Sequence, residues 1–192
     1  MHLMLNGPTT RLRTPAAILE TAAHLLADRP EASMGELAAA AGVGRATLYR
    51  YFPTREALLA ALASEAHQEL VARITDASLD RAPVPEALQR LLRVFLTVGD
   101  RYVVLMRERV KPHGPTEREE FERLILAPIQ ALFQRGVDDG TFRDDLGADA
   151  LAHLFGGLVL AAKQTALPRT RGVEQTAASL ASLFLDGARR HP

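Results

Sequence analysis

The 192-residue sequence contains no cysteine. A disulfide framework and thiolate metal sites are therefore excluded, and the composition is compatible with a reducing cytoplasm. No stretch approaches 18 uncharged apolar residues, so no membrane span is predicted. The first residues lack the length and cleavage pattern of a signal peptide. We therefore expect a cytoplasmic protein without membrane association.

The sequence also has little that suggests catalysis. It contains no H-E-x-x-H motif, no P-loop, and neither of the motifs G-x-S-x-G and G-x-G-x-x-G. Asp149 and His153 are four residues apart and could share a metal ion on one helix face, but two ligands do not make a metal site. We predict that the protein is not an enzyme and uses no cofactor and no metal.

Excess charge is a third absence, because the formal net charge at pH 7 is zero. Residues 1–60 hold six arginines against five acidic residues, so this segment has a net charge of only +1. Non-specific affinity for nucleic acid grows with the number of phosphates that a protein neutralises. Any nucleic-acid interface must therefore be a local patch with modest non-specific affinity.

Apolar residues make up 47% of the sequence, which is enough for a substantial core. Their periodicity predicts an all-α fold with about nine helices. The predicted helices cover approximately residues 15–27, 34–41, 44–51, 54–80, 86–98, 101–110, 116–137, 148–166 and 173–189. Thr116 and Glu119 form a capping box at the start of the seventh helix, and Pro128 predicts a kink within it.

Residues 33–59 show the most informative pattern, which consists of two short helices separated by a glycine. Ser33 and Glu36 form an S-x-x-E capping box, which starts the first helix. Gly42 stands where a helix ends in the left-handed conformation. This arrangement is typical of a helix-turn-helix reader of the DNA major groove.

The second helix of this pair covers about residues 44–51. Leu48 anchors it to the core, and Phe52 ends it because the following Pro53 favours extended backbone. Thr54 is the expected N-cap of the next helix. The inner side and both ends of the helix are thereby predicted.

The outer side of the second helix carries Arg45, Ala46, Tyr49 and Arg50. Arginine binds guanine edges or phosphates, tyrosine donates to phosphates, and alanine allows close approach or touches a thymine methyl group. Arg55 lies in the first turn of the next helix, where a docked phosphate would offset its unfavourable interaction with the helix dipole. The alternative is a helical hairpin with solvated arginines.

Residues 42–59 closely resemble the signature of TetR-type transcriptional regulators, and the resemblance is specific over about residues 14–62. It implies a three-helix DNA-binding domain over residues 14–60 and a helical ligand-binding and dimerisation domain over residues 61–192. Residues 1–13 are expected to form a mobile arm. This arm either reaches a phosphate or the minor groove or has no role.

The resemblance also assigns DNA contacts. The matching positions are Arg45, Ala46, Thr47, Tyr49, Arg50, Tyr51 and Arg55. The three hydroxyl-bearing residues match contacts to the DNA backbone, whereas the alanine and the first two arginines match positions that face bases or nearby phosphates. The spacing between Tyr51 and Leu48 allows a core role as well as a contact, and both alternatives stay open. Family members often carry a basic residue in the second helix, a place held here by residues 34–36 without one.

By the same resemblance, the last two helices form the four-helix bundle of a two-fold dimer, which would bind a pseudo-palindromic operator. The predicted interface residues are Leu151, Leu158, Leu180 and Phe184. The alternative is that the apolar stripes containing these residues are ordinary core.

A small-molecule effector is expected among the middle helices, where it would alter the spacing of the two DNA-binding heads. The predicted pocket residues are Phe95, Tyr102, Met106, Phe121, Ile125, Phe155 and Val159. The alternative is plain core, which is the more common role of such residues, and helical spacing does not separate lining from filling. Polar residues that could orient a ligand are Arg101, Arg107, His153, Lys163 and Gln164.

The sequence therefore predicts a sequence-specific DNA-binding transcriptional regulator. We expect a homodimeric repressor that a small-molecule effector releases from a double-stranded DNA operator. The alternative function is a helical small-molecule-binding protein without DNA binding, which the near-neutral head and the missing basic residue in the second helix would explain.

Overall fold

The computed structural model describes residues 14–108, 114–165 and 170–189, except for the side chains of Tyr102, Leu105, Met106 and Arg107. Two predicted pocket residues, Tyr102 and Met106, and the predicted arm over residues 1–13 therefore lie outside the described part. The described residues form an all-α fold with one isolated antiparallel bridge between Phe142 and Arg189. Among these helices, none combines the length and apolar character needed to cross a bilayer.

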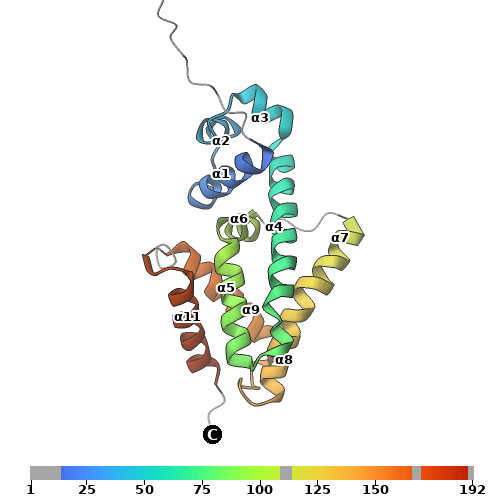
Figure 1. The fold of residues 1–192 in the computed structure, drawn as a ribbon, viewed down its shortest axis with the longest axis vertical. Helices are drawn as coiled ribbons and strands as arrows, with labels where there is room; N and C mark the ends of the chain where they lie inside the picture. The colour runs from blue at the N-terminus through green and yellow to red at the C-terminus, as the bar shows by residue number, and fades with distance from the viewer. Residues whose placement is uncertain (1–13, 109–113, 166–169, 190–192) are drawn as a thin grey trace, which may run out of the picture.

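Three short N-terminal helices form a head, and the long helix α4 leads from this head into a larger helical body (Figure 1). The helices of the head and the connecting helix are α1 (Pro15–Asp28), α2 (Met34–Ala40), α3 (Arg45–Tyr51) and α4 (Arg55–Ala77). The elements of the body are η1 (Leu79–Arg81), α5 (Val84–Val98), α6 (Asp100–Glu108), α7 (Gly114–Phe121), η2 (Glu122–Leu126), α8 (Ala127–Asp138), α9 (Gly147–Gln164) and α11 (Val173–Ala188).

Side-chain caps start α1, α2 and α4, as the sequence predicts, whereas α3 follows Gly44 without one. The hydroxyl of Thr14 accepts from the backbone of α1, with Pro15 at the first helical position. Ser33 and Glu36 form the complete capping box of α2, and Thr54 caps α4. The expected helices of the head are thereby confirmed.

The seventh helix differs from its prediction. It begins at Gly114, so Thr116 lies inside α7 and is not its cap. Before Pro128 the chain widens into the π-helical segment η2, and the amide of Ala127 donates to the carbonyl of Glu122, five residues earlier. Proline lacks an amide hydrogen and clashes with the preceding helical turn. The wider π-helical turn accommodates Pro128, so that α7, η2 and α8 follow one another without a break.

The end of α4 also differs from its prediction, because the helix stops at Ala77 and not at Asp80. Ser78 adopts the left-handed conformation with a φ of 46°, and the single 3-10 turn η1 follows. A left-handed residue breaks the helical hydrogen-bond ladder, so it ends the helix here.

Helix α4 belongs to two hydrophobic clusters. Its first half contributes Leu58 and Leu62 to the head cluster, whereas Leu70 and Ile74 pack in the body cluster. The head cluster consists mainly of Ile18, Leu19, Leu26, Leu37, Leu48, Leu58 and Leu62, joined by Val104 of α6. One rigid helix therefore couples the head to the body, and α6 lies against the head as a second connection.

Candidate nucleic-acid interface and effector groove

The start of α2 is held by the capping box. The backbone amide of Ser33 donates to Glu36 Oε2 at 2.9 Å, and the amide of Glu36 donates to the Ser33 hydroxyl at 3.3 Å. Arg29 adds a bond from Nη1 to Glu36 Oε1 at 3.2 Å. These bonds, the one from the Ser33 backbone foremost, lower the pKa of the Glu36 carboxyl below its ordinary value.

The turn between α2 and α3 depends on Gly42, whose φ of 67° lies in the left-handed region. The amide of Gly42 donates to the carbonyl of Ala39 at 3.0 Å, and the amide of Val43 donates to that of Ala38 at 2.9 Å. Both bonds use carbonyls that the end of α2 would otherwise leave without partners. The turn thereby sets the direction in which α3 starts.

The side chain of Leu48 is completely buried and fixes the inner side of α3 on the head cluster. The outer side then presents Arg45, Ala46, Tyr49 and Arg50, all exposed, with Tyr49 at 46% of its full area. Tyr49 is one of the few large apolar side chains with such exposure. The predicted reading face therefore stands free on the surface of the head.

Tyr51 lies at the rim of the head core, which is one of the two roles that its spacing leaves open. Its side chain is half-buried and packs against the head cluster, with its ring 6.4 Å from that of Phe52. The guanidinium carbon of Arg50 lies 5.1 Å from the centre of the Tyr51 ring, which is the geometry of a cation–π contact. Tyr51 thus supports the side chain of Arg50 from the rim of the core.

Arg55 requires a correction, because its guanidinium points into the protein. Nη1 donates to the carbonyl of Ala32 at 2.8 Å, and Nη2 donates to that of Pro30 at 2.6 Å. Nη2 also lies 3.1 Å from Glu108 Oε1 in α6. These partners occupy the group predicted to bind a phosphate, so Arg55 joins the loop between α1 and α2, the start of α4 and the end of α6.

An apolar groove of about 470 Å³ lies between α8 and α9 and extends inward to α5. Its lining residues are Phe95, Leu126, Ile129, Gln130, Asp149, Ala152, His153, Phe155, Gly156, Gly157 and Leu160. The rings of Phe95 and Phe155, both predicted pocket residues, are 6.3 Å apart at its floor. Leu126, Ile129 and Gln130 were missed, because the π-helical segment that changes the register of α8 has no clear sequence signal.

Three other predicted pocket residues lie elsewhere. Ile125 and Val159 are buried in the body core and do not line the groove. Phe121 is half-buried, with its ring edge-on to that of His67 at 5.6 Å. Lys163 does not line the groove either, since its ammonium donates to the carbonyl of Leu96 at 3.3 Å.

Comparison with known proteins identifies the family. Residues 18–62 match the family model described as bacterial regulatory proteins, tetR family. The chain is 33% identical over 175 residues to the HTH-type transcriptional regulator NfxB of Pseudomonas aeruginosa, covering 89% of this chain and 92% of NfxB. The chain belongs to the TetR family.

A second TetR-family relative is the HTH-type transcriptional repressor LfrR of Mycolicibacterium smegmatis, which is 33% identical over 190 residues. That alignment covers 83% of this chain and 95% of LfrR. The crystal structure of LfrR in complex with proflavine superposes with a TM-score of 0.64 at 28% identity, over 93% of this chain and 98% of that one. The protein is thus a DNA-binding transcriptional regulator, and the alternative without DNA binding is disfavoured.

In this TetR-family chain, the residues predicted for the dimer interface are not the most exposed apolar residues of α9 and α11. Leu151 and Leu180 are buried within the chain, so they are core residues. Leu158 is half-buried against the core, and Phe184 packs edge-on to Phe133 at 6.0 Å. The large apolar side chains that remain exposed on α9 and α11 are Leu154, at 58%, and Leu183, at 61%.

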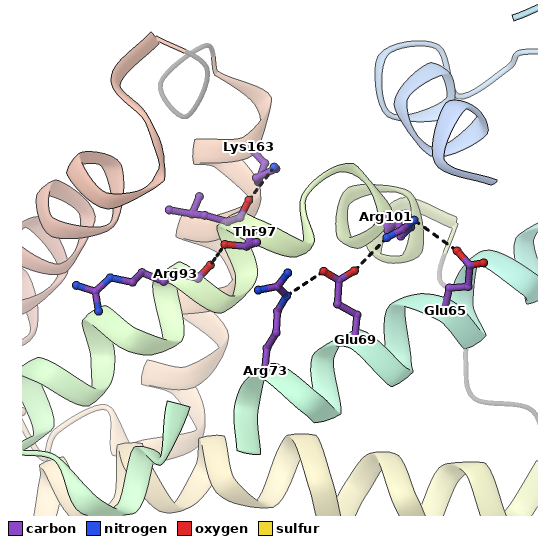
Figure 2. Close-up of polar contacts among 8 residues, drawn as sticks. Glu65, Glu69, Arg73, Arg93, Thr97, Arg101 and Lys163 are labelled. Carbon is purple, nitrogen blue, oxygen red and sulfur yellow. Dashed lines mark hydrogen bonds and ion pairs between the residues drawn. The ribbon is translucent and has the colours of Figure 1, made fainter. Parts of the chain in front are cut away.

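A charged cluster joins α6 to α4 in the TetR-family body (Figure 2). Arg101 of α6 donates from Nη1 to Glu69 Oε2 at 3.0 Å, and its Nη2 lies 3.4 Å from Glu65 Oε2. Arg73 donates from Nε to the other oxygen of Glu69 at 2.9 Å. Because His24 of α1 also contacts Asp100 at the start of α6, this helix is joined to both the head and α4 by polar side chains.

Proposed function

We propose that this TetR-family regulator is a repressor that binds its operator through the exposed face of α3. The proposed DNA contacts are Arg45, Ala46, Thr47, Tyr49, Arg50 and Tyr51. One observation carries this proposal: the burial of Leu48 leaves both arginines and Tyr49 facing outward. The relative LfrR is described as a transcriptional repressor, which supports repression over activation. No catalytic activity is proposed.

The repressor is proposed to act as a homodimer on a pseudo-palindromic operator. The exposed Leu154 and Leu183 support this assembly, because a dimer through α9 and α11 would remove both apolar side chains from water. A two-fold dimer presents the same helix twice, so its operator contains two related half-sites. Leu158 and Phe184 lie at the edge of this face, and Leu151 and Leu180 support it from inside.

The groove between α8 and α9 is proposed to bind the effector. Its aromatic floor and apolar walls favour a planar apolar molecule, and Asp149 is the one acidic side chain among its lining residues. A negative rim attracts cations and repels anions. The effector class is therefore neutral or cationic, and the complex of LfrR with the dye proflavine supports that choice.

The DNA-binding proposal is tested by measuring the affinity for an operator selected from genomic fragments. Replacing Arg45 or Arg50 with alanine should cost about 1–3 kcal/mol if the residue reads a guanine. A residue that binds a phosphate should instead reduce the salt dependence, with a log–log slope smaller by about 0.9. Arg81→Ala, which removes an exposed arginine from η1, is the matched control. Full operator affinity in the double variant would overturn the proposal.

The effector site is tested by calorimetric titration of proflavine into the protein without DNA. Ala152→Phe fills the groove and should abolish binding. Asp149→Asn should weaken binding about two- to fivefold, the range of an exposed charge pair. Asp76→Asn, which changes an exposed aspartate of α4 outside the groove, is the control. Unchanged proflavine binding by Ala152→Phe would show that the effector binds elsewhere.

A further inference from the structure

Gly35 is the second residue of α2, and no feature of its backbone requires glycine. Its φ is not positive, unlike that of Gly42 in the following turn. Within a helix, glycine costs about 1 kcal/mol relative to alanine. A different requirement must therefore explain why this position has no side chain.

The space beside Gly35 is filled by the guanidinium of Arg45, the first residue of α3. A Cβ atom built on Gly35 would lie 2.9 Å from Nη2, 3.1 Å from Nε and 3.2 Å from Cζ of Arg45. Non-bonded carbon contacts are optimal at about 3.5–4.0 Å. The present orientation of Arg45 is therefore available only while residue 35 has no side chain.

Gly44 provides an internal comparison, because it immediately precedes Arg45. A Cβ atom on Gly44 would meet nothing within 4 Å. The close approach is thus specific to Gly35 and is not a general feature of the glycines near the turn. The sequence of α2, MGELAAA, contains no basic residue, so Arg45 brings a positive charge from α3 over the first turn of α2.

We propose that Gly35 is a positioning residue for operator recognition, because it directs the guanidinium of Arg45 across the junction of α2 and α3. The inference depends on the proposed function, in which Arg45 contacts DNA. A methyl group at residue 35 displaces only the end of a flexible side chain, so the fold of the head is kept. Position 35 therefore controls how Arg45 meets the operator.

A double-mutant cycle with Gly35→Ala, Arg45→Ala and the combined variant tests this proposal, with operator affinity and thermal unfolding as readouts. Gly35→Ala should keep or raise the melting temperature, because alanine favours the helix. It should weaken operator binding at least about twofold, the lower end of couplings between residues in contact. In the Arg45→Ala background, the same change should leave affinity unaltered.

The outcomes separate this proposal from the function on which it depends. If Arg45→Ala binds the operator normally, Arg45 is not a DNA contact and both proposals fail at this residue. If Arg45→Ala weakens binding but Gly35→Ala does not, the positioning role is overturned and the proposed function stands. If Gly35→Ala still weakens binding in the Arg45→Ala background, Gly35 acts by another route and the positioning role is again overturned.

Discussion

Gly136 of α8 is buried beneath the ring of Phe142, which follows the turn after this helix. A Cβ atom at residue 136 would overlap with Phe142 Cδ2 and lie 3.1 Å from Val84 Cγ1. Phe142 cannot retreat, because it is completely buried and stacks on Phe133 at 5.6 Å. Gly136→Ala should therefore destabilise the protein by about 1–3 kcal/mol in urea unfolding, as overpacking does.

Gly187→Ala is the matched control for this change. Gly187 lies in a helix as well, but a Cβ atom there meets nothing within 4 Å. This variant should be as stable as the unmodified protein or more stable, since alanine favours helix by up to about 1 kcal/mol. Equal stabilities of the two variants would show that the contact between residues 136 and 142 is relaxed without cost.

The sequence predicts which stripes of α9 and α11 are apolar, but not which leucine of a stripe faces a partner. Leu151 and Leu154 are three residues apart, so a helix places them only about 60° apart around its axis. The first is buried and the second is exposed. The difference depends on where α5 and α8 pack against α9, and such long-range packing leaves no mark in the local spacing.

At the scale of elements, the helix starts of the head were predictable because their signals are local. The capping box of α2 and the cap of α4 involve residues three positions apart. The π-helical segment before Pro128 was not predictable in the same way, because proline indicates only that regular hydrogen bonding fails nearby. Residues of the groove on α8 were missed for this reason.

Arg55 shows how one side chain joins separate elements, and the loss of its three partners should be measurable. Arg55→Ala should lower the free energy of unfolding by about 1–3 kcal/mol, because the part-buried carbonyls of the loop between α1 and α2 lose their donor. The salt dependence of operator binding should stay unchanged, since the guanidinium is already held by partners within the protein. Chemical unfolding and binding titrations at several salt concentrations measure the two effects.

Arg81→Ala again serves as the control for loss of an exposed arginine. A stable Arg55→Ala variant whose salt slope is smaller by about 0.9 would restore the phosphate contact expected from the sequence. The two roles give opposite patterns, so one pair of measurements decides between them. The sequence suggested the phosphate because it shows the charge of Arg55 but not its partners, which are two carbonyls of the loop between α1 and α2 and the Glu108 carboxylate of α6.

The whole molecule has a formal net charge of zero, which limits the DNA affinity of a single head. Few phosphates are neutralised per head, so a single head should bind DNA weakly. Two linked heads convert the second contact into an intramolecular step at high effective concentration. Operator affinity should therefore depend on dimerisation more strongly than in a highly basic protein.

This dependence is tested by placing charges on the exposed face of α9 and α11. The double variant Leu154→Asp and Leu183→Asp should remain folded, because both side chains are more than half exposed. It should be monomeric in analytical ultracentrifugation and lose operator affinity, since buried carboxylates oppose association. Leu146→Asp changes another exposed leucine, which precedes α9, and should keep the dimer. A dimeric double variant would place the interface elsewhere, whereas a monomer with full operator affinity would show that one head suffices.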